Sequence, residues 1–482
     1  MRPIPAKASM PSISLQLPVG STIGRSGQEA NQRLINGYVE TLGDDGEGKS
    51  KFVIYADPGL TLFNQDYAYA KTPRGLILLD DNHLLGVLGF QVAKFGTDGT
   101  STFLTNLSGT DHVTMALNMN ATPQVAIVTD GGAYYLLIGS SLSVPTTSFG
   151  APNSVCYVKG YYVFTTSAGQ IFHSAVDDGT SFNALSFDYA NSDPDGLVRG
   201  VAHVGYLYAF GKKSLEIWQN VGTTPFAFAP VQQYIEHGLL AKYSVAQNDK
   251  GLMWVDHRGI VRWGRDGGAQ RVSTHTVERA IEELSDTDRA ALRGSYATSQ
   301  GHEWYTLSSP SWTWVLDLQA NRWHQRQSYS NTRWIGGDSI WFNGHWITAD
   351  YRNGTLYTLN ADDFTENGDE FTMELWCKHA HNFPDAFVCD QLNIDVISGA
   401  GLEYGDIEDT DPVITVDVSD NGGKTFRFER TASIGKQGDY NKLVSINQWG
   451  RISQKGRIWR IRGTSKTLRG VIQAGIDVRP CY

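Results

Sequence analysis

The sequence predicts an all-β protein, with a degenerate β-propeller of six or seven blades followed by a β-sandwich. Three observations lead to this prediction. The chain is rich in aromatic residues and glycine, with 13 Trp, 22 Tyr, 20 Phe and 51 Gly, which suits strands joined by tight turns. Short apolar runs recur along most of the chain. After about residue 365 the strands become longer and alternate cleanly.

Size and charge narrow the class of protein. A chain of 482 residues exceeds the size at which one core normally stops growing, so we expect more than one domain. The net charge of −10 argues against a nucleic-acid coat, which would be basic, but leaves open a protein past which DNA slides, because a weakly acidic wall repels phosphate. The four scattered cysteines favour assembly in a reducing cytoplasm. We recognise no signal segment and no membrane-spanning run.

Residues 1–65 are expected to form an N-terminal arm and two strands. Residues 1–30 are rich in Ser, Gly and Pro and show little periodicity, which predicts an extended arm. Alternation predicts strands at 33–40 and 52–60, separated by an exposed turn.

Residues 66–362 are expected to form the propeller. Pairs of apolar runs surround turns such as DGG, SAG, HRG and RNG, which is typical of hairpins. These units recur at roughly 40 to 50 residues, as propeller blades do. A surface helix is predicted near 274–293, capped by Ser273 or Thr274, and its apolar face consists of Val277, Ala280, Ile281 and Leu284.

Residues 363–482 are expected to form the β-sandwich, and one of its turns resembles an Asp-box. This turn is SDNGGKTF at 419–426, and SAVDDGTSF at 174–182 is a looser relative. In such a turn a polar side chain bonds backbone N–H groups and an aromatic packs below. We interpret both as folding devices, because a sialidase also needs an arginine triad and a nucleophilic tyrosine.

No segment carries a catalytic motif, and we predict a protein that is not an enzyme and has no cofactor or metal. Nucleophile-elbow, P-loop and H-E-x-x-H patterns are missing from the sequence. Three potential metal ligands would share one face of a strand: Cys377, His379 and His381. A zinc or iron site is therefore conceivable, but a fourth ligand is not obvious. We favour the interpretation that this strand lies at a subunit contact. An acidic loop could hold calcium but lacks the spacing of a known loop: Asp406, Glu408, Asp409 and Asp411.

A basic stretch near the C-terminus is the clearest charge anomaly in this acidic chain. It has no acidic residue and interleaves with Trp449 and Trp459. We predict contact with a protein partner or with DNA phosphate, against the alternative of an exposed strand face. Reversing the charge at Arg460 and Arg462 is then expected to block attachment without unfolding the monomer. The predicted contact residues are Arg451, Lys455, Arg457, Arg460, Arg462, Lys466 and Arg469.

Several segments in order resemble the packaged-DNA stabilisation family of short-tailed phages, also called tail nozzle or head-completion proteins. They include NQRLINGYVE, ADPGLTLF, the long run from HSAVDDGTSF to SLEIWQNVG, YIEHGLLAKYSV, QRVSTHTVERAI, TWVLDLQANRWHQR and GKQGDYNKLVSINQWGRISQKGRIWRIRG. Where we would expect an Arg-Leu-Gly run, the last segment has Gln448-Trp449-Gly450.

This resemblance implies a propeller with a platform built from both chain ends, assembled as a hexameric ring beneath the portal-adaptor ring of the virion tail. The function implied is to extend the DNA ejection channel, retain packaged DNA and dock tail spikes, fibres or a needle. Double-stranded DNA would pass without sequence-specific binding, and no direct membrane insertion is implied. The alternative is a receptor-binding or polysaccharide-depolymerising propeller at the tail tip, for which the sequence offers no convincing carboxylate pair.

Overall fold

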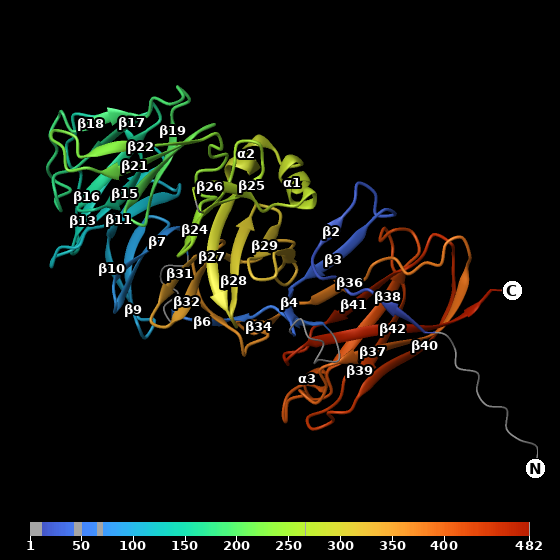
Figure 1. The fold of residues 1–482 in the computed structure, drawn as a ribbon. Helices are drawn as coiled ribbons and strands as arrows, with labels where there is room; N and C mark the ends of the chain where they lie inside the picture. The colour runs from blue at the N-terminus through green and yellow to red at the C-terminus, as the bar shows by residue number, and fades with distance from the viewer. Residues whose placement is uncertain (1–11, 43–50, 65–70, 266, 482) are drawn as a thin grey trace, which may run out of the picture. The chain divides into compact units, whose positions relative to one another are not determined.

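The computed structural model divides the chain into two compact units, each assembled from segments that are distant in sequence (Figure 1). It describes residues 12–42, 51–64, 71–265 and 267–481. We name one the propeller unit, which comprises Leu62–Ser311 and Trp334–Leu359. We name the other the sandwich unit, which comprises Met1–Thr61, Trp312–Arg333 and Asn360–Tyr482. The segment 312–333, predicted to belong to the propeller, is grouped by its contacts with the two chain ends.

The propeller unit is a succession of antiparallel sheets, each formed by strands consecutive in sequence. Its four-stranded sheets are β7–β10 (Pro73–Asp80, His83–Leu88, Gln91–Gly96, Ser101–Asn106), β11–β14 (Val113–Leu117, Gln124–Thr129, Tyr134–Ile138, Ser141–Ser143), β15–β18 (Pro152–Val158, Tyr161–Thr166, Gln170–His173, Phe187–Tyr189), β19–β22 (Leu197–His203, Tyr206–Gly211, Leu215–Asn220, Phe228–Ile235) and β23–β26 (Ala246–Asn248, Gly251–Val255, Val261–Arg265, Gly268–Arg271). Two further groups are β27–β28 (Arg293–Ser299, His302–Ser308) and β31–β33 (Gly336–Phe342, His345–Asp350, Leu356–Asn360).

The sheets close into a ring, as a β-propeller requires. The first strands of most successive groups lie beside one another, and β31 of the last group lies beside β7 of the first. Between β19 and β23, the apolar cluster that contains Val201 and Val245 joins the two blades. Apolar clusters fill the spaces between blades, and the cluster that closes the ring joins Leu84 and Phe95 to Phe342, Ile347 and Leu356. In the described part of the chain, seven first strands surround the axis, within the predicted six or seven.

Two short helices lie where the sequence predicts one longer surface helix. Helix α1 (His275–Glu282) buries Val277 and Ile281, two members of the predicted apolar face. Helix α2 (Asp286–Ala290) starts anew because the Ser285 side chain accepts a hydrogen bond from the backbone N–H of Asp288 at 3.1 Å. The predicted cap Thr274 lies at the N-cap position of α1, without a side-chain cap hydrogen bond.

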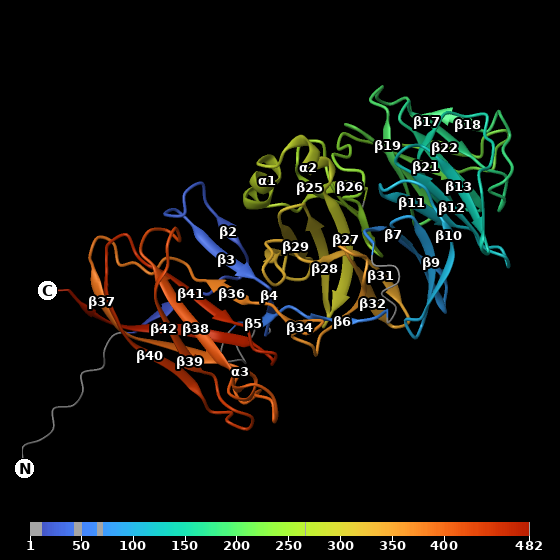
Figure 2. The same ribbon diagram turned by 180° about the vertical axis from the view of Figure 1, so that it is seen from behind.

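The sandwich unit contains two sheets and takes strands from both chain ends (Figure 2). One sheet has the order β4 (Gly37–Thr41), β5 (Phe52–Ala56), β42 (Gly470–Pro480), β37 (Phe387–Val396) and β40 (Leu443–Ile452), with β1 (Ser12–Leu15) beside β42. The other contains β29 (Thr313–Asp317), β30 (Arg322–Arg326), β3 (Asn31–Ile35), β36 (Met373–Trp376), β41 (Ile458–Gly463), β38 (Val413–Ser419) and β39 (Arg427–Ser433), with β2 (Thr22–Ile23) beside β3. Short elements complete the unit: β6 (Gly59–Leu62), β34 (Thr365–Glu366), β35 (Asp369–Glu370) and α3 (Ile407–Thr410).

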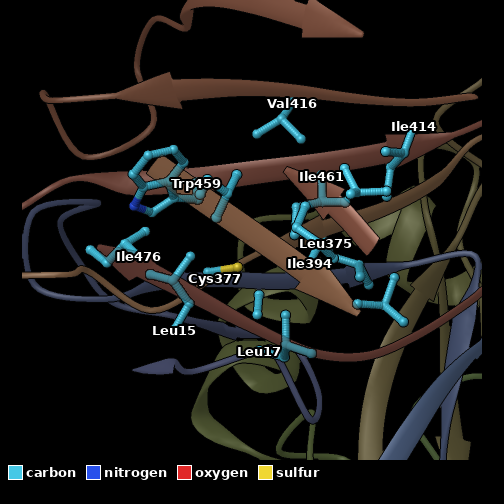
Figure 3. Packing of buried hydrophobic residues seen from close by; sticks show 14 of the residues in the cluster. Leu15, Leu17, Leu375, Cys377, Ile394, Ile414, Val416, Trp459, Ile461 and Ile476 are labelled. Carbon is cyan, nitrogen blue, oxygen red and sulfur yellow. The ribbon is translucent and has the colours of Figure 1, made fainter. Parts of the chain in front are cut away.

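One continuous core joins the two sheets of the sandwich unit (Figure 3). Leu15 from the N-terminal end of the chain packs into the same cluster as Ile394 and Ile476 of one sheet and Val416 and Trp459 of the other. Because side chains from both chain ends fill this core, neither end can form the sandwich alone. The predicted construction from both ends is therefore confirmed.

Candidate functional site

The basic stretch predicted as a contact surface comprises the end of strand β40, the turn that follows it, strand β41 and the segment that leads to β42. Arg457 is fully buried beside β41. Its guanidinium donates to Asp420 at 2.7 and 3.1 Å, to the Trp449 carbonyl at 2.7 Å and to the Arg451 carbonyl at 3.0 Å. Although burial alone would raise the pKa of Asp420, the Arg457 guanidinium outweighs it and the pKa is lowered. Arg457 therefore stabilises the fold.

Arg460 and Arg462 converge on one buried carboxylate. Arg460 donates from Nε to Asp417 at 2.8 Å, and Arg462 donates to the same carboxylate at 3.1 Å and to Glu429 at 2.6 Å. Asp417 is almost fully buried. Burial alone would lower the pKa of Arg460, but the hydrogen bond to Asp417 outweighs it and the pKa is raised. The positive charge of this pair is largely neutralised inside the sandwich unit.

Lys466 and Arg469 are also bound internally. Arg469 is buried and donates to the carbonyls of Phe371, Gly463 and Phe364 at 2.7 to 3.2 Å. Burial lowers its pKa to about 10. The Lys466 ammonium lies 3.8 Å from the Asp409 carboxylate.

Arg451 and Lys455 differ from the other five basic residues. Both are exposed, and neither side chain has a partner among the residues that the structure describes. Arg451 lies near the end of β40, and Lys455 lies in the turn that leads to β41. These two side chains are the ones free to contact another molecule.

The Cys/His cluster is divided between different surroundings. Cys377 is fully buried in the sandwich core, where burial raises the pKa of its thiol to about 12 (Figure 3). His379 bonds through Nε2 to the Gly27 carbonyl at 3.0 Å, and His381 is exposed. No group of three metal-ligating side chains occurs in the described residues.

The acidic loop contains a short helical turn, and two of its four carboxylates, those of Asp409 and Asp411, bind within the protein. Its residues Ile407–Thr410 form α3. Asp409 is buried and accepts a hydrogen bond from the Lys466 backbone at 3.3 Å, and Asp411 accepts one from the Ser433 hydroxyl at 2.5 Å. These contacts give the loop a structural role.

Both Asp-box-like turns are closed by polar side chains, as their sequences predict. Asp178 accepts from the backbone N–H of Thr180 at 2.9 Å and from its hydroxyl at 2.7 Å. In the second turn Ser419 accepts from the N–H of Gly423 at 2.9 Å, while Asp420 binds Arg457 instead. Phe426 packs edge-on against Trp376 at 4.7 Å between ring centroids.

A cavity that was not predicted from the sequence lies on the axis of the propeller unit. It has a volume of about 510 Å³ and is lined by all seven first strands. Among its charged residues, Arg199 and Asp338 come from blades far apart in sequence, so no local motif marks them. Only a correct assignment of each blade's first strand could have found them.

Comparison with protein families identifies the two units. A model of the β-propeller of bacteriophage P22 Gp10 matches residues 47–363, and a model of the β-sandwich of the same protein matches residues 372–479. The chain belongs to the bacteriophage P22 Gp10 family. The first model describes a phage stabilisation protein. As a member of this family, the chain is a phage tail structural protein and part of the virion. The resemblance noted in the sequence is thereby confirmed.

Solved structures give more distant likenesses. YCF48 bound to D1 peptide is 12% identical, with a TM-score of 0.40, and the match covers 64% of this chain and 98% of that one. U3-55K is 11% identical, with a TM-score of 0.40 and coverage of 63% and 99%. A search of curated protein sequences finds no match. Among the described residues, no helix is long and apolar enough to cross a membrane.

Proposed function

We propose that this chain is a tail nozzle protein, which forms a hexameric ring below the portal-adaptor ring of a short-tailed phage. The ring extends the DNA ejection channel, retains packaged DNA and docks the distal tail parts, which are spikes, fibres or a needle. Assembly takes place in the host cytoplasm. The observation that carries this proposal is the pair of family matches, which together span both units of the chain.

The internal construction of each unit supports a role in a ring. The propeller unit and the sandwich unit each bury their own core, so their outer surfaces are available for contacts between subunits. A closed ring needs a head-to-tail interface, in which two different surfaces of each subunit meet. We assign Arg451 and Lys455 to one of these surfaces or to the contact with the adaptor, because both are exposed.

The charge of the chain supports passage of DNA rather than tight binding. The net charge is −10, and five of the seven basic residues of the C-terminal stretch are occupied by internal partners. Nonspecific DNA binding depends on many free Lys and Arg contacts to phosphate. Double-stranded DNA can therefore pass this protein without being held by sequence-specific contacts.

A genetic test separates DNA retention from head filling. Phage with a stop codon in this gene is grown in a nonsuppressing host, and DNA inside the heads is measured with and without added nuclease. We expect heads that fill and then lose their DNA, with restoration when the intact gene is supplied. Stable, filled heads without the protein would contradict the proposal.

A further inference from the structure

The axis of the propeller unit holds a cavity with two chemically different ends. All of its lining residues belong to the propeller unit. Charged and polar groups occur near the starts of the first strands. A second space there, of about 190 Å³, shares Arg199 and Asp338 with the first and is also lined by His112 and Tyr243. Aromatic rings occur further along the strands. Since every blade begins with its inner strand, the starts of these strands meet at one end of the axis.

Two guanidinium groups at or beside the charged end each have a donor without an acceptor: Arg199 lines the cavity, and Arg293 directly precedes the lining residue Gly294. Arg199 donates from Nη1 to the Lys242 carbonyl at 3.0 Å, but its Nε is buried and has no acceptor among the described residues. Arg293 has a buried Nη1 in the same condition. Burial lowers the pKa of both groups, yet arginine stays charged in proteins. Leaving buried charged donors unsatisfied is costly, so an anion beside these two guanidinium groups would be stabilised.

A third arginine at this end shows what a satisfied group looks like. Arg74 is buried and donates to four backbone carbonyls, those of Asp111, Gly89, Leu107 and Ser108, at 2.6 to 3.2 Å. Arg74 thus holds loops together. The positive charge of Arg74 is therefore used within the fold, whereas Arg199 and Arg293 each keep a donor that could bind a ligand.

The neighbouring groups leave a positive excess. Asp130 is engaged by Lys242 and accepts from the Tyr243 hydroxyl at 2.7 Å. Asp338 interacts electrostatically with Arg199 and Arg293 but forms no ion pair in the described part of the chain. Burial and the nearby Arg293 lower the pKa of His112 to about 4, so His112 is neutral at pH 7. The Asp338 carboxylate therefore interacts electrostatically with two guanidinium groups, which leaves a net positive charge here.

The other end of the cavity is an aromatic wall. It contains Tyr157, Tyr296, Trp341 and Trp346. Trp346 packs edge-on against Trp341 and Tyr296, with ring centroids 5.6 Å apart in both pairs. Trp341 is 50% exposed, so part of its side chain is accessible to a ligand. Aromatic faces of this kind offer an apolar platform with large contact area.

We propose that the axial cavity of the propeller unit binds a carboxylate-bearing sugar. Arg199 and Arg293 would bind the carboxylate, because a guanidinium matches a carboxylate in geometry and charge. Asp338 would accept a hydrogen bond from a sugar hydroxyl, whereas it would repel a phosphate dianion. The aromatic wall would pack against the apolar face of the ring. The volume of about 510 Å³ falls within the range of small-ligand sites. This site goes beyond the nozzle role and does not depend on ring formation.

Calorimetric titration of the full-length chain tests the proposal. The ligands are D-galacturonic acid and N-acetylneuraminic acid, with neutral D-galactose and a tetra-alanine peptide as comparisons. We expect at least one acidic sugar to bind. D-galactose should bind at least about tenfold more weakly because it lacks the carboxylate of the charge-assisted pair, and the peptide should bind at least about tenfold more weakly because it offers no sugar ring to the aromatic wall. Arg199→Gln, Arg293→Gln and Trp341→Ala should each weaken binding by about tenfold or more. The exposed Arg258 supplies a matched control, Arg258→Gln, which should bind as the parent does.

Each remaining outcome would overturn the proposal. Equal binding of acidic and neutral sugars would exclude the guanidinium site, and no binding of either acidic sugar would exclude a saccharide of this class. Tighter binding of the peptide would reassign the cavity to a protein carboxylate. Should the arginine variants fail to fold, Trp341→Ala and the comparison of ligands on the parent chain decide the question, since Trp341 lies outside the buried core.

Discussion

Arg457 and Asp420 form a two-point ion pair inside the sandwich unit, with the Nε to Oδ1 distance at 2.7 Å and the Nη2 to Oδ2 distance at 3.1 Å. Arg457→Met should lower the free energy of unfolding by about 3 kcal/mol, because it removes one of the two arginines that bind the partly buried Asp420 carboxylate and leaves two carbonyls without their donor. The control Arg451→Met removes an exposed side chain and should change stability by no more than about 0.5 kcal/mol. Urea unfolding monitored by tryptophan fluorescence compares the two. Equal effects would contradict this assignment.

Charge reversal at Arg460 tests the pair with Asp417. Arg460→Glu places a second carboxylate against a buried one and should destabilise the sandwich unit by about 3 kcal/mol or more. The sequence alone predicted that charge reversal at Arg460 and Arg462 would leave the monomer folded. Because of these ion pairs, we now expect charge reversal to destabilise it. Lys455→Glu, at an exposed position, should leave the melting temperature unchanged and impair attachment to the adaptor instead. A stable Arg460→Glu protein would refute the role of this pair.

Acid should destabilise the sandwich unit through Asp57. This carboxylate is buried 3.4 Å from Nε2 of His324. Burial alone would raise its pKa, but His324 and Arg326 outweigh it and the pKa lies below the ordinary value. A depressed pKa contributes stability that is complete above the unfolded pKa, about 3.9, and is lost as pH falls through the folded pKa. The urea concentration at the unfolding midpoint of the parent should therefore decrease when the pH is lowered below about 4.

The variant Asp57→Asn isolates this contribution. It should cost about 3 kcal/mol near neutral pH, where the charge is paired, and its deficit relative to the parent should shrink as pH falls below about 4. Urea midpoints measured across that range give both quantities. A deficit that is independent of pH would mean that Asp57 acts through packing alone.

Metal removal should leave the sandwich unit intact. Cys377 is buried in the core with a raised pKa, so its thiolate is not available to a metal, and His381 is exposed. Dialysis against EDTA should therefore leave the melting temperature and assembly state unchanged. A fall in either that zinc restores would establish a metal site after all.

The fold was predictable because its signals are local. Hairpin turns and alternating strands mark the blades, and the turn at Asp178 closes as its sequence indicates. The partners of the basic stretch were not predictable. Asp417 and Asp420 lie about forty residues before the arginines that they bind, and strand pairing between β38 and β41 brings them together. The run of positive charge in the sequence therefore predicted more free basic side chains than the folded protein has. Arg199 and Arg293 were not predictable for the same reason, because the residues around the axis come from different blades.

The central claim is tested most directly by the assembly that forms on the portal-adaptor complex. The mass of the purified chain is measured alone and after mixing with that complex from the same phage, and the product is imaged by electron microscopy. The account predicts that six copies join as a ring with an axial hole, coaxial with the adaptor. A stable free trimer, or no binding to the adaptor, would contradict the nozzle role and favour a receptor-binding or depolymerising propeller at the tail tip.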